Sequence, residues 1–71
     1  MDPWLRQTMD AIGADAELSD ADSEALLKIA KIAAHTSDSR TNAPLLCYLI
    51  GRVQGDRGLD EILEQVRRSS S

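Results

Sequence analysis

Residues 45–53, LLCYLIGRV, constrain the fold of this chain more than any other segment. Their apolar side chains surround almost the whole circumference of a helix, and only Gly51 and Arg52 interrupt them. A helix that is apolar on nearly all sides is buried on most of them in a folded protein. We therefore predict a helix over about residues 43–54 and place it at the centre of the fold, where other helices cover it.

A second helix is predicted over about residues 59–68, where apolar residues follow the i, i+3, i+4, i+7 spacing of one helix face. These residues are Leu59, Ile62, Leu63 and Val66. Acidic residues at its start and arginines at its end have the signs that favour the helix dipole. The serines of residues 69–71 are expected to form a frayed tail.

Capping signals mark two more helices, over about residues 3–12 and 20–36. Asp2 can cap the first, whose opening proline suits the first helical position, and Gly13 is expected to end it. Ser19 can cap the other, which has acidic residues in its first turn. Both segments carry apolar residues at helical spacing, so both can pack against a core.

The composition agrees with a helical chain, because Ala, Leu and Ile supply most of the apolar residues and only two of 71 residues are aromatic. A chain of 71 residues makes one domain, here residues 1–71. We therefore predict an all-α fold, a compact bundle of four helices with short loops.

The charge balance disfavours several classes of function. The chain has 12 acidic and 8 basic residues, a net charge of −4 and a pI near 4.7, so a phosphate backbone would be repelled. No basic amphipathic or long apolar stretch suits a membrane, and the first residues do not resemble a signal peptide. We expect no nucleic-acid partner, no membrane association and a cytoplasmic location.

Candidate catalytic and metal-ligating residues are few. A single Cys cannot form an internal disulfide, and one Cys with one His is too few for a structural zinc site. Cys47 lies in the apolar helix, where a free thiol is usually a small buried hydrophobe. An acidic cluster lacks the order of a calcium loop and fits a solvated helix start better; it comprises Asp15, Glu17, Asp20, Asp22 and Glu24. We predict no catalytic residue, no metal and no cofactor.

The polar loop between the second and third helices contains the strongest candidates for a binding surface. His35, near the end of the preceding helix, can bond to the last carbonyls and meet the negative end of the helix dipole. Thr41 or Asn42 can cap the following helix, and Arg40 lies just before them. The alternative interpretation is functional: free N–H groups and a nearby guanidinium can hold an anion or contact a partner.

Two further residues have alternative roles. Trp4, the largest apolar side chain, is expected to close one end of the core; if it is exposed instead, it becomes an interface anchor. Gly51 interrupts an apolar helix at a cost of about 1 kcal/mol relative to Ala. It therefore indicates the close approach of another helix, either within the chain or across a dimer.

Several of these residues together resemble a family of small helical domains of unknown function from actinobacteria. The matching positions are Trp4, Ala34, His35, Arg40, Ala43, Pro44, Leu45, Tyr48, Leu49 and Gly51. Members of that family are often fused to, or encoded beside, the guanylyltransferase that attaches GMP to molybdopterin. The resemblance implies an accessory role in molybdenum-cofactor biosynthesis. The loop TSDSRTN is more polar than the family's usual version.

The first functional hypothesis is thus a non-enzymatic interaction module with a protein partner, which the resemblance suggests is a molybdopterin guanylyltransferase. Self-association into a homo-oligomer is a second way to use the same surfaces. An acyl-carrier-like protein is the alternative function, because Asp38 and Ser39 form an Asp-Ser dipeptide near mid-chain. A helix-turn-helix regulator is a further alternative, although its recognition helix would carry Arg52 alone.

Overall fold

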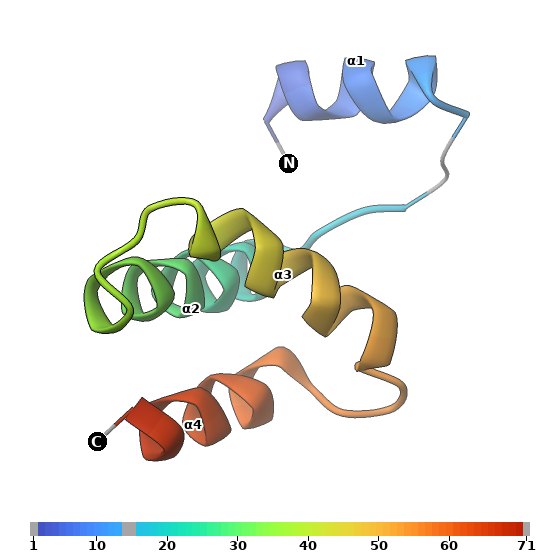
Figure 1. The fold of residues 1–71 in the computed structure, drawn as a ribbon. Coiled ribbons are helices and arrows are strands. Elements are labelled where there is room, and N and C mark those ends of the chain that lie inside the picture. The colour runs from blue at the N-terminus through green and yellow to red at the C-terminus, as the bar shows by residue number, and fades with distance from the viewer. Residues whose placement is uncertain (1, 14–15, 71) are drawn as a thin grey trace.

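A computed structural model describes residues 2–13 and 16–70, and it contains four helices joined by short connections (Figure 1). They are α1 (Pro3–Ala11), α2 (Asp20–Thr36), α3 (Asn42–Val53) and α4 (Leu59–Ser70). No strand occurs within the described ranges. The predicted all-α fold of four helices is confirmed.

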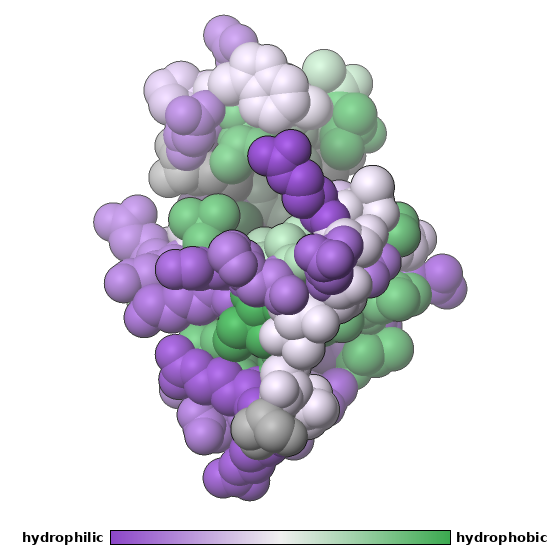
Figure 2. Space-filling view, turned by 60° about the vertical axis from the view of Figure 1, so that its left-hand side comes forward, coloured by the Kyte–Doolittle hydropathy of each residue, from purple (hydrophilic) through white to green (hydrophobic). Residues whose placement is uncertain are grey.

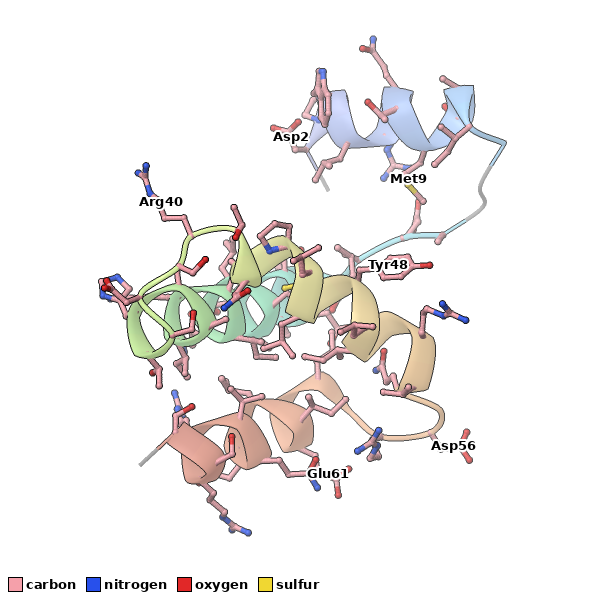
Figure 3. All side chains as sticks on the ribbon, in the orientation of Figure 1. Asp2, Met9, Arg40, Tyr48, Asp56 and Glu61 are labelled. Atoms are coloured by element: carbon pink, nitrogen blue, oxygen red, sulfur yellow. The ribbon has the colours of Figure 1, made fainter. Side chains whose placement is uncertain are left out.

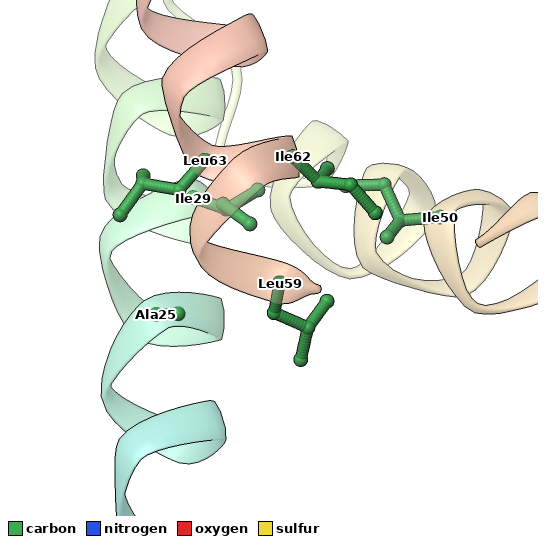
Figure 4. Close-up of a cluster of buried hydrophobic side chains, with 6 residues drawn as sticks. All are labelled: Ala25, Ile29, Ile50, Leu59, Ile62 and Leu63. Carbon is green, nitrogen blue, oxygen red and sulfur yellow. The ribbon is translucent and has the colours of Figure 1, made fainter. Parts of the chain in front are cut away.

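The hydrophobic core is built around α2, which packs against both α3 and α4. The side chain of Ile29 on α2 has no exposed surface, and five further buried residues surround this position (Figure 4). These are Ala25, Ile50, Leu59, Ile62 and Leu63. Because α2 contributes to both helix–helix interfaces, it is the central element of the fold.

The prediction that α3 is central and covered on most sides is wrong. Ile50 is its only buried residue, and four large apolar side chains of α3 are more than half exposed. Their exposed fractions are 59% for Leu45, 64% for Tyr48, 55% for Leu49 and 65% for Val53. The apolar pattern identified the helix correctly, but α1 does not cover the side of α3 that α2 and α4 leave free.

Helix α1 stands apart from the other three helices (Figure 1). Across the described residues it makes no close backbone approach to another helix, and none of its residues is buried. It is attached instead to the segment before α2, where Arg6 Nη1 lies 2.7 Å from Glu17 Oε1. Leu5, Met9 and Leu18 line a hollow of about 270 Å³ between α1 and this segment. Trp4 therefore does not close the core.

The predicted capping residues act as expected at the starts of α1 and α2. Asp2 Oδ1 accepts hydrogen bonds from the backbone N–H groups of Trp4, at 2.8 Å, and Leu5, at 3.3 Å. Ser19 Oγ accepts from the Asp22 N–H at 3.0 Å. Gly13 follows α1 with a φ of +74°, a conformation that glycine adopts at little cost.

The end of α4 differs from the prediction, because the helix continues through Ser69 and Ser70 rather than fraying after residue 68. The Ser69 hydroxyl donates a hydrogen bond of 2.9 Å to the carbonyl of Val66, so this side chain bonds within the last turn of the helix. Ser71 lies outside the described residues. Ser69 and Ser70 are therefore part of the helix, and their side chains lie on its surface.

Arg57 stabilises the connection between α3 and α4 in a way that the sequence analysis missed. Its Nη2 donates to the Val53 carbonyl at 2.8 Å and its Nε to the Gln54 carbonyl at 3.2 Å. The Gln54 amide returns a 2.8 Å bond to the Arg57 carbonyl, and Gly55 turns the chain with a φ of +59°. A guanidinium here satisfies carbonyls that a helix end leaves unpaired.

Replacing Ile29 with Ala should lower the free energy of unfolding by about 2–5 kcal/mol, because it leaves a cavity where α2 meets its neighbours. Leu27, which is 71% exposed on the same helix, provides the control. Leu27→Ala should change stability by less than about 0.5 kcal/mol. Urea unfolding followed by circular dichroism would measure both, and equal losses for the two variants would contradict the central position of Ile29.

The attachment of α1 should depend on pH through Glu17. The hydrogen bond from Arg6, together with its charge, lowers the pKa of Glu17. Such a carboxylate stays ionised and keeps its ion pair with Arg6 when the pH is above the ordinary glutamate pKa of about 4.3. It becomes protonated and loses the ion pair as the pH falls through the lowered pKa. The fluorescence anisotropy of Trp4 in dilute solution should therefore be steady from neutral pH to about pH 4 and fall in more acidic solution.

Glu17→Gln is the control for this titration. It should show the lower anisotropy already at neutral pH, because an amide cannot replace the charge. A variant that titrates like the wild type would show that another carboxylate holds α1.

Candidate functional site: an apolar groove beside the α2–α3 loop

An open groove of about 490 Å³ lies between the last turn of α2, the first half of α3 and the last turns of α4. Its apolar lining consists of Ala33, Leu45, Leu46, Leu49 and Val66. Its polar lining consists of Thr36, Ser37, Asn42, Ser69 and Ser70. The groove thus combines an apolar interior with hydroxyl and amide groups.

The packing of the three core helices explains why this groove is open. Helices α3 and α4 each pack against α2, but over the described residues their backbones do not approach each other closely. They meet through buried side chains such as Ile50 and Ile62 (Figure 4). At the loop end, Ala33 of α2 contributes only a methyl group, so a volume between the helices stays unfilled.

The loop before α3 uses most of the donors that an anion would need. The Asn42 N–H donates to the Ser39 carbonyl at 3.2 Å, and the Ala43 N–H donates to the Arg40 carbonyl at 3.3 Å. Pro44 has no N–H to offer. Thr41 occupies the cap position without a side-chain capping bond, because its hydroxyl lies 2.9 Å from the hydroxyl of Ser39. An anion bound here would depend on side chains rather than on the helix N-terminus.

The two predicted cationic residues are exposed. His35 lies in the last turn of α2, where a cation favours the helix dipole. The nearby Ala33 carbonyl accepts its side-chain hydrogen bond from the hydroxyl of Ser37 and not from His35. Arg40 extends from the loop into solvent, away from α4 (Figure 3). Over residues 2–13 and 16–70, neither side chain forms a hydrogen bond or ion pair.

The structure does not gather the predicted site residues into one site. Asn42 alone among them lines the groove, with His35 and Arg40 flanking it in the chain. Trp4 lies on α1 and is 66% exposed, which is the condition under which it was expected to anchor an interface. Sequence reasoning missed the groove itself, because its lining comes from three helices whose relative placement no local pattern reveals.

The thiol and the acidic residues considered as catalytic or metal-ligating candidates do not form a reactive site in the described part of the chain. Cys47 is half-buried, and burial raises the pKa of its thiol, which disfavours the reactive thiolate. Oε1 of Glu24 lies 3.8 Å from Nζ of Lys28, so this carboxylate forms an ion pair along α2. Asp20 lies in the first turn of α2, where an acidic side chain favours the helix dipole. Asp15 of the acidic cluster lies outside the described residues. No three His, Cys, Asp or Glu side chains within the described ranges group as metal ligands.

The fold and the groove define a small all-α domain with an open apolar surface. The chain belongs to the family described as "Domain of unknown function (DUF6457)", whose family model matches residues 1–71. Comparison with curated proteins and with solved structures finds no match. No helix in the described part of the chain is long and apolar enough to cross a membrane.

The thiol of Cys47 should react slowly with a disulfide reagent such as DTNB in the folded protein. Because burial raises its pKa, the thiolate fraction at pH 8 is smaller than that of a free cysteine, whose pKa is about 8.5. The rate should rise with pH beyond that value and increase when urea unfolds the chain. Reaction of the folded protein at the rate of its urea-unfolded form would contradict the burial of this side chain.

Proposed function

We propose that this domain is a non-enzymatic interaction module that docks a protein partner in the groove between α2, α3 and α4. The observation that carries the proposal is the groove itself, with its apolar lining and polar residues at one end of the bundle. Protein interfaces combine an apolar centre with a polar rim in this way. The groove has the size to receive one or two apolar side chains of a partner.

The composition of the lining favours a protein over a small metabolite. Sites for small molecules fix their ligands with precisely placed polar groups, often including a charged residue or a metal. None of the ten lining residues of this groove is charged. Leu45 and Leu49, which are both more than half exposed, instead offer the apolar area that a partner's side chains can cover.

Charge next to the groove supports the same surface. His35 directly precedes the lining residue Thr36, and Arg40 lies two residues before Asn42. Exposed cations at this end of a chain with a net charge of −4 would contact acidic groups of a partner. At the rim of an interface such contacts affect the rate of association and its salt dependence more than the final affinity.

The family resemblance supports a particular partner. Domains of the family that the chain resembles are often fused to, or encoded beside, molybdopterin guanylyltransferases, and the proposed partner is therefore that enzyme. The domain would then act as an accessory module in molybdenum-cofactor biosynthesis, in the cytoplasm. This part of the proposal rests on the association of related genes, and the chemistry of the guanylyl transfer belongs to the partner.

The geometry favours neither alternative function. A carrier protein presents its serine for modification, whereas Ser39 is half-buried and its hydroxyl pairs with that of Thr41. A recognition helix needs polar and basic residues on its exposed face. The exposed face of α3 presents mainly apolar residues, and Arg52 is its one basic residue.

Binding to a purified molybdopterin guanylyltransferase, measured by isothermal titration calorimetry, tests the proposal. Leu45→Glu should weaken binding at least about tenfold, because it places a charge in the apolar groove. The double variant His35→Ala/Arg40→Ala should weaken binding by a smaller factor and reduce its salt dependence. Leu27→Glu and Lys28→Ala/Lys31→Ala are the matched controls on the exposed side of α2.

Different outcomes contradict different parts of this proposal. If the wild-type domain does not bind the enzyme, the assignment of the partner is wrong. If it binds and Leu45→Glu behaves like Leu27→Glu, the groove is not the docking surface.

A further inference from the structure

The only two aromatic side chains of the chain are both exposed outside the groove. Trp4 is 66% exposed on α1, and Tyr48 is 64% exposed on α3. The guanidinium of Arg52 lies 5.8 Å from the centre of the Tyr48 ring, a cation–π contact that orients the ring. Trp, Tyr and Arg are the residue types that most often dominate the binding energy of protein interfaces. Their exposure marks a candidate interface surface on each of these two helices.

On α3 these residues form a row distinct from the groove. Pro44, Tyr48, Gly51 and Arg52 follow the i, i+4, i+7, i+8 spacing of one helix side, and none of them lines the groove. We call these four residues the Tyr48 row. The ring of Tyr48 extends outward from α3 (Figure 3).

Gly51 makes this row accessible to another chain. A Cβ built at Gly51 would meet no atom within 4 Å, so nothing within the described chain requires a glycine there. The explanation within the described chain is therefore wrong, and the open space beside Gly51 would admit a second molecule. Such an approach offsets the cost of about 1 kcal/mol that a glycine imposes inside a helix.

The matching surface lies on α1. Leu5 and Met9 line the hollow beside Leu18, whereas Trp4 and Ile12, which is 68% exposed, are directed elsewhere. Trp4 and Thr8 lie four residues apart on α1, and Ile12 follows at the same spacing as the C-cap residue, so the three form one edge. The Thr8 hydroxyl donates to the Trp4 carbonyl at 2.9 Å, so its proton keeps a hydrogen-bond partner when the surface is covered. We call these three residues the Trp4 edge.

The total exposed surface has the size that a dimer requires. The chain exposes 5489 Å², whereas a folded monomer of 7.8 kDa is expected to expose about 4,400 Å². The excess of about 1,100 Å² exceeds the roughly 800 Å² that each partner buries in a standard interface. Figure 2 shows apolar side chains on the surface of α1, at the top, and on the helices beneath it. A second copy in an interface of standard size would cover most of this excess.

We propose that the chain forms a two-fold homodimer in which the Trp4 edge of each copy packs on the Tyr48 row of the other. Within one chain, the Arg6–Glu17 ion pair and the hollow beside Leu18 hold α1 to the segment before α2, away from its own α3. Each copy therefore presents one edge and one row. Exchange of both contacts around a two-fold axis uses each edge and each row once, so the assembly closes at two copies.

Sedimentation velocity and the emission of Trp4, the only tryptophan, test this dimer together. At about 100 µM, above the micromolar limit of dissociation constants for interfaces of this size, the wild-type chain should sediment as a dimer. Its tryptophan emission should shift to the blue as concentration rises, because the indole leaves water. Tyr48→Glu should weaken dimerisation at least about tenfold and abolish this shift.

Leu27→Glu, at a large exposed apolar position on α2, is the control and should dimerise like the wild type. Circular dichroism would verify that both variants are folded. A wild-type chain that is monomeric at about 100 µM would overturn the proposal. A dimer whose tryptophan emission does not change, or that survives Tyr48→Glu, would equally overturn the assigned interface.

The homodimer and the binding of a guanylyltransferase can fail separately. Leu45→Glu changes the groove and should leave the dimer intact, whereas Tyr48→Glu changes the row and should leave the groove intact. A dimer without enzyme binding would refute the proposed function alone. Enzyme binding by a monomeric wild-type chain would refute the homodimer alone.

Discussion

The burial of Ile29 on α2 is the contact on which the rest of this structure depends. Its side chain is fully enclosed at the centre of a core that comprises six buried residues in the described part of the chain, and α3 and α4 both pack against the helix that carries it. A chain of this length buries a limited fraction of its surface, so one central helix with two partners is an economical arrangement. The same arrangement leaves much of α3 uncovered, because each outer helix faces α2 on one side only.

The two surfaces proposed for binding both follow from that uncovered part of α3. One side of the helix, with Leu45 and Leu49, faces the space beside α4 and forms the groove. The other side, with Tyr48, faces away from the core, where Gly51 leaves room for a close approach. A helix with apolar residues on nearly all sides can thus contact the core, a partner protein and a second copy of the chain on different sides. Under both proposals, the apolar residues on the surface of α3 would be covered by other chains.

Local features of the fold could be predicted from the sequence, and the arrangement of the helices could not. Asp2, Ser19 and Gly13 act within a few residues of their own positions, so their roles are visible in the sequence. The apolar residues of α3 predicted a helix correctly, but whether other helices cover Tyr48 depends on where α1 lies. Arg57 was missed because its role requires the turn at Gly55 that brings it back to the end of α3. The groove was missed for a similar reason, since Ala33, Leu45 and Val66 meet only after three helices are packed.

The separation of α1 from the core has a consequence for how stability should be described in this protein. A segment with no buried residue and no close helix contact can open without disturbing the packing around α2. The monomer then contains two cooperative units, and its amide hydrogens would exchange on two scales, fast in α1 and slow in α2. A single two-state free energy describes only the three-helix core in that case. Association of two copies would merge the units, because α1 then opens only when an interface is lost.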